Sequence, residues 1–139
     1  MIRKIAFRAW DKDRKVMRSA LGVDPRSKRV IAFLLPDEGS GQKEYENCEL
    51  MQFTGLLDKN GKEIYEGDVV RTEYFEGEQR DSKGRVKREE GWYVSRRKPV
   101  VIIWRAAKHT TGYNLGPIPK GKTRREIIGN IYENPELLK

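Results

Sequence analysis

The sequence predicts a mainly β protein built around a small antiparallel barrel, and three observations support this class. Two apolar runs, Val30–Leu35 and Val100–Trp104, have strand length and are rich in β-forming residues. Glycine and proline separate such runs along the chain, as turns require. The segment from Met51 to Val70 combines apolar alternation, an Asn-Gly turn and a Gly-Asp pair before a second apolar strand. We expect the barrel to extend from Met51 to Tyr132.

Residues 1–50 are expected to form an N-terminal strand region that packs on the barrel or on a partner subunit. Ile5, Phe7 and Ala9 alternate along one face of a first strand. After a polar turn, residues 15–17 return antiparallel and complete an N-terminal hairpin.

The next segment, from Arg18 to Arg29, is basic and shows no clean period, so we expect a loop there. The run Val30–Leu35 that follows is apolar throughout and ends at Pro36. This pattern predicts a strand buried on both faces.

The central segment is expected to form two strands around a tight turn. Asn60-Gly61 is a strong hairpin signal, because both residue types tolerate the positive φ angles of tight turns. Gly67 can adopt a backbone angle closed to other residues, and Asp68 can accept hydrogen bonds from the amides that follow it. This pair therefore marks the start of the next strand, Val69–Phe75.

Residues 76–98 are expected to be a charged insertion in the 51–139 core. Hydrophobic residues are sparse there, and eight basic but only three acidic residues lie between Arg80 and Lys98. Such a segment buries too little apolar surface to offset its ordering entropy. We expect a long mobile loop or an extended hairpin, with Trp92–Val94 as a short strand on its return leg.

The C-terminal part contains the remaining strands. Val100–Trp104 is a candidate central strand, with Tyr113–Leu115 pairing back onto it. The last strand is expected at Glu126–Tyr132, where Gly129 indicates a bulge or bend.

A short helical turn is expected at the C-terminus. Asn134 is a good N-cap, and Pro135 suits the first helical position. This turn should place Leu137 and Leu138 on the barrel.

Composition narrows the range of functions. The chain has 139 residues and a formal charge of +8, which permits polyanion binding. Its single cysteine, Cys48, excludes an intramolecular disulfide. The basic start lacks the apolar stretch of a secretory signal, and no run approaches the ~18 apolar residues of a membrane span. We therefore expect a soluble protein in the cytoplasm.

Three segments carry a family resemblance: Phe7–Met17, Met51–Val70 and Ile127–Leu138. They closely resemble the YopX family of phage and prophage proteins. The resemblance implies an SH3-like small barrel and the cytoplasm of a bacterial host. It transfers no catalytic residues to this chain, and the charged segment 76–98 looks like an insertion between matching blocks.

The first candidate site is a basic loop with aromatic residues in it. Small barrels bind nucleic acid by combining cations with aromatic stacking platforms. The alternative is a solvated loop whose aromatic residues pack on the barrel. The residues of the candidate nucleic-acid site are Arg85, Lys87, Arg88, Trp92, Arg96, Arg97 and Lys98.

A second group suggests a magnesium-dependent nuclease, namely the carboxylates Asp58, Glu63, Glu66 and Asp68. Turn chemistry explains Asp58 and Asp68 equally well. His109 is the only histidine and is expected in an exposed turn, so no site of paired histidines can form. Acidic neighbours should raise the pKa of the Cys48 thiol, which argues against a reactive nucleophile.

The preferred function is a non-enzymatic binding or adaptor protein of phage or prophage origin that contacts nucleic acid through the basic loop. The alternative is a structural, self-assembling oligomer in which strands such as Val30–Leu35 are shared between subunits. A metal-dependent nuclease is the least favoured hypothesis. We expect no cofactor, no metal, no small-molecule substrate and no membrane partner.

Overall fold

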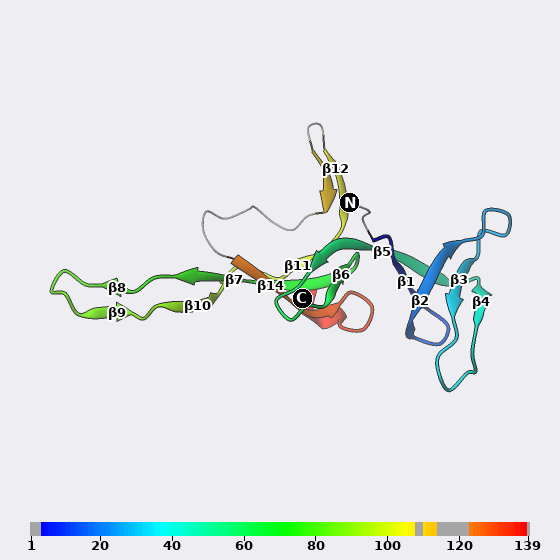
Figure 1. Cartoon of the computed structure of the whole chain (residues 1–139), viewed down its shortest axis with the longest axis horizontal. Coiled ribbons are helices and arrows are strands. Elements are labelled where there is room, and N and C mark those ends of the chain that lie inside the picture. Colours follow the sequence, from blue (N-terminus) through cyan, green and yellow to red (C-terminus); the bar gives the residue numbers. More distant parts are fainter. Residues whose placement is uncertain (1–3, 108–109, 114–122, 139) are drawn as a thin grey trace. The chain divides into compact units, whose positions relative to one another are not determined.

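The computed structural model describes residues 4–107, 110–113 and 123–138 (Figure 1). The chain divides into two compact units. Unit 1 lies within residues 1–56 and 63–67, and unit 2 lies within residues 57–62 and 68–139. The strands of the paired ladders run antiparallel, so the predicted mainly β class is confirmed.

Unit 1 is one six-stranded sheet with the order β4-β3-β2-β1-β5-β6. The first hairpin joins β1 to β2, as predicted, and β5 pairs along the other edge of β1. Residues 51–56, which we expected in the barrel, thus belong to the N-terminal sheet. In chain order the strands are β1 (Phe7–Asp11), β2 (Val16–Val23), β3 (Val30–Phe33), β4 (Gln42–Tyr45), β5 (Cys48–Leu57) and β6 (Glu63–Tyr65).

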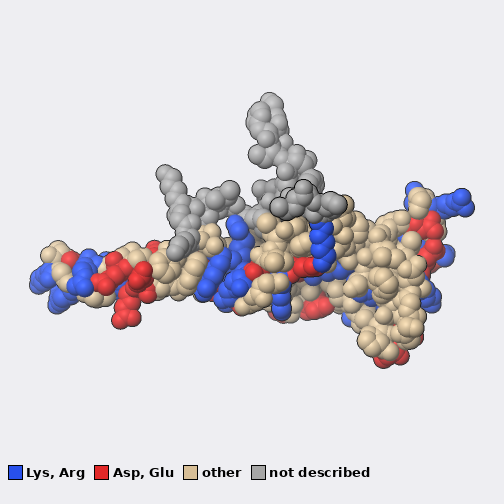
Figure 2. All heavy atoms as spheres, in the orientation of Figure 1, with Lys and Arg blue, Asp and Glu red and all other residues tan. Residues whose placement is uncertain are grey.

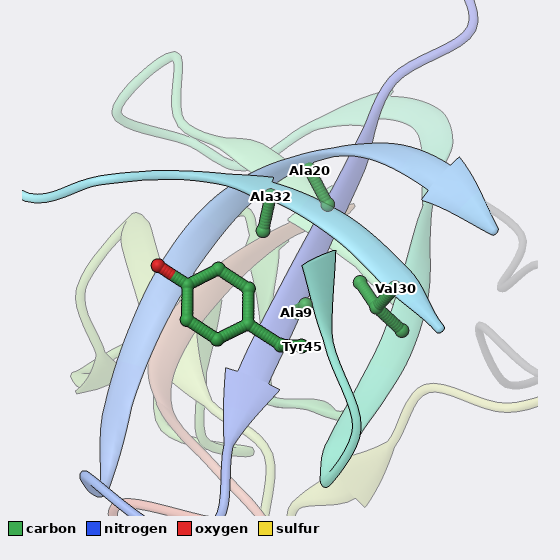
Figure 3. Packing of buried hydrophobic residues seen from close by; sticks show 5 residues of the cluster. All are labelled: Ala9, Ala20, Val30, Ala32 and Tyr45. Atoms are coloured by element: carbon green, nitrogen blue, oxygen red, sulfur yellow. The ribbon is translucent and has the colours of Figure 1, made fainter. Parts of the chain in front are cut away.

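The core of unit 1 is small because alanines form much of it (Figure 3). Ala9, Ala20 and Ala32 come from three neighbouring strands, and the ring of Tyr45 lies against them with Val30. Small side chains on three strands leave room for one large ring above them. This arrangement holds the edge strand β4 on the sheet.

Two expectations for this region are wrong. The segment from Arg18 to Arg29 is not all loop, because β2 continues through Val23. The strand at 30–33 is buried on one face only, since Val30 and Ala32 are buried while Phe33 is 39% exposed. The apolar alternation of β2 could not be recognised in the sequence, because Arg18, a charged residue, occupies a fully buried position.

Unit 2 is organised around β7 (Asp68–Glu76), whose Val69 and Val70 are fully buried. β14 (Thr123–Asn130) pairs along one edge of β7. β10 (Gly91–Val94) and β11 (Val100–Val101) pair with the other edge. Among the strands that the structure describes, no ladder closes this sheet into a barrel.

The predicted strand Val100–Trp104 is divided in the structure. β11 ends at Val101, and Trp104 begins β12 (Trp104–Ala107), which pairs with β13 (Thr110–Tyr113). Tyr113 pairs back onto Trp104 as expected, while residues 114 and 115 lie outside the described residues. The buried Ile102 donates its backbone N–H to the Asp68 carbonyl at 2.9 Å, so the break at 102 still anchors the chain to β7.

The Asn60-Gly61 turn is confirmed, but only one of its two residues has a positive φ angle. Gly61 has φ 81° and donates its N–H to the Asp58 carbonyl at 3.0 Å. Asn60 keeps a negative φ, so only the glycine uses the left-handed region. Gly67, with φ 85°, precedes β7 as predicted.

The bulge at Gly129 is also confirmed, because the β7–β14 register shifts between Ile127 and Gly129. A Cβ atom at position 129 would lie 2.5 Å from Asn134 Oδ1 and 2.7 Å from Leu137. The 3₁₀ turn η1 (Pro135–Leu138) therefore packs directly on the glycine, and Leu138 stays exposed.

Residues 76–91 form an extended hairpin, the second of the two expected alternatives. β8 (Gln79–Arg80) pairs with β9 (Val86–Arg88), and the ribbon continues into β7 and β10. Its terminal turn is held by Asp81, whose carboxylate accepts the N–H groups of Lys83 and Arg85 at 2.9 Å each. Figure 1 shows this arm as a thin ribbon extending from β7 and β10.

Candidate nucleic-acid interface

The aromatic residues at the base of the arm are arranged by strand pairing. Trp92 lies opposite Phe75, and Tyr93 lies opposite Tyr74. Because paired residues share a face and neighbours alternate, the first pair lies on one face of the ribbon and the second on the other. The Trp92 and Phe75 rings meet edge to face at 5.5 Å, so both contribute to packing within unit 2.

One face of the Trp92 ring is covered by a cation from another strand. The Arg124 guanidinium lies 4.1 Å above this ring and also contacts Glu73 through Nε at 2.5 Å. Trp92 remains 37% exposed. Arg124 therefore prevents a nucleobase from stacking on the ring face that it covers.

Arg124 belongs to a chain of alternating charges on the β7–β14 sheet. Lys59 Nζ bridges Glu73 at 2.9 Å and Glu126 at 3.5 Å, and Arg71 contacts Glu126 at 2.5 Å. Hydrogen bonds from Lys59 and Arg124 hold the pKa of Glu73 below its ordinary value. The cations of this network are thus neutralised within the unit and are poor candidates for phosphate binding.

Two of the predicted cations are also engaged within the arm. Arg85 Nε contacts the Asp81 carboxylate at 3.1 Å. Arg88 contacts Glu76 at 3.1 Å and lies over the Tyr93 ring at 3.6 Å. These side chains stabilise the ribbon itself.

The other four predicted cations are exposed and form no ion pair with any residue that the structure describes. Lys87 lies on β9, while Arg96, Arg97 and Lys98 form the connection from β10 to β11, which we term the basic connection. Ser95 fixes its start by donating its N–H to the Thr72 carbonyl at 2.9 Å and accepting the Arg97 N–H at 3.2 Å. Three consecutive exposed cations without an ion pair to any described residue thus follow the anchored Ser95.

The seven predicted residues do not form one patch. Residues 79–88, the arm tip, are separated from the basic connection by an acidic collar of Glu76, Glu78, Glu89 and Glu90. Figure 2 shows the first part of this order, with cationic surface at the end of the arm and acidic surface next to it. Arg85, Lys87 and Arg88 therefore belong to the tip, and Trp92, Arg96, Arg97 and Lys98 belong to the base.

Sequence reasoning missed Arg124, which lies in β14, 32 residues after Trp92 in the chain. Arg124 and Glu126 alternate along β14 as Arg71 and Glu73 alternate along β7. This complementary pattern was the available signal, but it identifies partners only once the register is known.

Three of the four carboxylates of the nuclease hypothesis have separate local roles. Glu63 accepts the Tyr65 hydroxyl at 2.9 Å, and Glu66 accepts the Gln52 N–H at 2.9 Å. Asp58 accepts N–H groups from Asn60 at 2.8 Å, Lys62 at 2.9 Å and Ile127 at 3.1 Å. Burial alone would raise the pKa of Asp58, but these donors outweigh it and lower the pKa. Within the described residues, no three metal-ligating side chains gather in a group that fits a metal ion.

Four single residues remain to be compared with the sequence-based expectations. Trp10 is buried, while His109 and the side chain of Trp104 lie outside the described residues. The Cys48 thiol has a raised pKa, first through burial and then through the Asp11 carboxylate. Burial thus adds to the acidic effect that we expected.

Known proteins resemble this chain in sequence and in fold. The protein-family model described as YopX protein matches residues 6–139 of this chain. This range includes the expected insertion at 76–98. The crystal structure of protein EF1440 from Enterococcus faecalis has 22% identity and a TM-score of 0.50, covering 98% of this chain and 99% of that chain. No curated protein matches the sequence. In the described part of the chain, no helix is both long enough and apolar enough to span a bilayer. The family match over nearly the whole length shows that the chain belongs to the YopX protein family.

Proposed function

We propose that this protein is a non-enzymatic binding module that contacts nucleic acid through the basic connection. The observation that carries this proposal is the run Arg96-Arg97-Lys98, three exposed cations without an acidic partner among the described residues. Phosphate contacts by such cations release condensed counterions, which provides a favourable and salt-dependent binding free energy.

Trp92 supplies the second component of the interface. It lies in β10, which leads directly into the basic connection, and it is partly exposed. Arg124 covers one ring face at 4.1 Å and fixes the ring orientation. A base that stacks on the ring face not covered by Arg124 would contribute about 1–3 kcal/mol, which favours single-stranded substrates.

Three further elements of this proposal rest on family membership and on the ladders. We assign the protein to phage or prophage genomes and to the cytoplasm of a bacterial host, because three of its segments resemble a family of phage and prophage proteins. We also assign an SH3-like barrel to the second unit, since β7 has strands along both edges. A solution structure of the whole chain would test whether the sheet around β7 closes into a barrel.

The test is the salt dependence of binding to a labelled single-stranded oligonucleotide, measured by fluorescence anisotropy. Three phosphate contacts give a slope of log K against log salt of about −2, and hence a loss of about 20-fold between about 50 and 200 mM salt. A variant with Arg96, Arg97 and Lys98 changed to Gln should lose most of this slope.

A matched control removes the same charge elsewhere. Lys15, Arg26 and Lys43 are exposed in unit 1 and form no ion pair with any described residue. Changing these three to Gln should leave the slope near the wild-type value. Equal losses of slope in both variants would show that binding depends on net charge and not on the basic connection. Absence of binding at physiological salt would refute the proposal.

A further inference from the structure

The arm presents open strand edges. β8 and β9 pair only with each other among the described strands, so the outer edge of each is free of backbone partners there. A ribbon of two strands is marginally stable alone, and its unpaired N–H and C=O groups can template the addition of another strand. Val86 adds an apolar side chain in β9 that is 49% exposed.

The charges on the arm are segregated along its length. The tip, residues 79–88, has five basic residues and one acidic residue, so its formal charge is positive. The acidic collar has four glutamates, so its formal charge is negative. Figure 2 shows the change from cationic to acidic surface along the arm.

Part of this charge is neutralised within the arm. Arg80 contacts Glu78 at 2.5 Å, Arg85 contacts Asp81 at 3.1 Å, and Arg88 contacts Glu76 at 3.1 Å. Four exposed residues remain without an ion pair to any described residue. They are Lys83 and Lys87 in the tip, and Glu89 and Glu90 in the acidic collar.

We propose that the arm binds the arm of a second copy of this chain, side by side and antiparallel. In that arrangement the free lysines of each tip lie beside the free glutamates of the other collar. A twofold axis makes the two contacts identical, so both sets of unpaired charges are matched at once. The open edges join in the same step, and Val86 is covered.

A second copy fits this surface better than a nucleic acid does. Glu89 and Glu90 would repel phosphates along the arm, whereas a second arm brings lysines to them. The inference is independent of the nucleic-acid proposal, because the basic connection lies outside both the tip and the acidic collar.

The test uses two charge-reversal variants of the full chain in sedimentation equilibrium. The tip variant carries Lys83→Glu with Lys87→Glu, and the collar variant carries Glu89→Lys with Glu90→Lys. The wild type should dimerise reversibly, with twice the 16.2 kDa of one chain at high concentration. Each variant alone should dimerise at least about tenfold more weakly, because each now places like charges side by side.

Mixing the two variants is the decisive measurement. The acidic tip of the first then meets the basic collar of the second, and the basic tip of the second meets the acidic collar of the first. The mixture should form a heterodimer with about the wild-type affinity. This recovery also shows that both variants are folded.

Three outcomes would overturn the proposal: a wild type that remains monomeric at every concentration, variants that dimerise like the wild type, or a mixture that does not associate.

Discussion

The substitution Arg18→Met should destabilise unit 1 strongly, because Arg18 is a fully buried charge with three acceptors. Its Nε contacts Asp11 at 3.2 Å, its Nη2 contacts Glu38 at 2.8 Å, and its Nη1 contacts the Phe33 carbonyl at 3.3 Å. The guanidinium also lies 4.5 Å from the Tyr45 ring centroid. This one side chain joins β1, β2, β3 and β4.

The size of the effect follows from what the substitution leaves behind. Asp11 is 1% exposed and would lose its buried cationic partner. Removing one member of a buried ion pair costs about 3–5 kcal/mol. Asp11 keeps the N–H donors of Asp13 and Arg14 at 3.1 and 3.2 Å, so we expect the lower end, about 3 kcal/mol.

Urea unfolding followed by circular dichroism measures this loss, and hydrogen exchange of residues 16–33 assigns it to unit 1. Arg14→Met is the matched control, because Arg14 contacts the same Asp11 at 3.2 Å with a side chain that is 49% exposed. Exposed pairs contribute about 0–1 kcal/mol. Equal effects of the two substitutions, or a loss below about 1 kcal/mol for Arg18→Met, would refute the reasoning.

Three further predictions concern pH, the bulge and the Asp58 turn. Hydrogen bonds from Arg18 lower the pKa of Glu38 to about 2, so this group should stabilise unit 1 at neutral pH and lose that contribution as pH falls below about 4. Acid titrations of the wild type and Glu38→Gln should differ in that window, and parallel curves would contradict the assignment. Gly129→Ala should cost about 1–3 kcal/mol by overpacking against Asn134 and Leu137, whereas Gly77→Ala, with no atom near the added Cβ, should cost less than about 1 kcal/mol in the same urea assay. Asp58→Ala should destabilise unit 2 by about 1–3 kcal/mol, because it leaves three backbone donors without their acceptor; unchanged exchange at Ile127 would count against this role.

Local rules predicted the elements whose cause is local. Gly61, Gly67 and Gly129 each hold the unusual backbone or the bulge that their sequence context indicated. The strand at Trp92–Val94 was also predicted, because aromatic residues interrupt a charged segment there. These features depend on backbone preferences within a few residues.

The wrong predictions arose where tertiary contacts override the local pattern of apolar and charged residues. Arg18 breaks the apolar alternation of β2, yet Asp11 and Glu38 make its burial favourable from 7 and 20 residues away. The candidate site was misjudged for the same reason. Net charge along 76–98 identified the cations. Only the strand pairing places Glu76 and Glu78 across from Glu89 and Glu90 in one acidic collar, and only the folded structure places Arg124 over Trp92.

The most direct test of the proposed interface is the NMR signal of each arginine Nε–H during titration with a single-stranded oligonucleotide. Arg96 and Arg97 have no acidic partner among the described residues, whereas Arg88 and Arg124 contact Glu76 and Glu73. The signals of Arg96 and Arg97 should shift with saturation while that of Arg88 stays in place. Shifts confined to the arm tip, or an unchanged spectrum, would contradict the account.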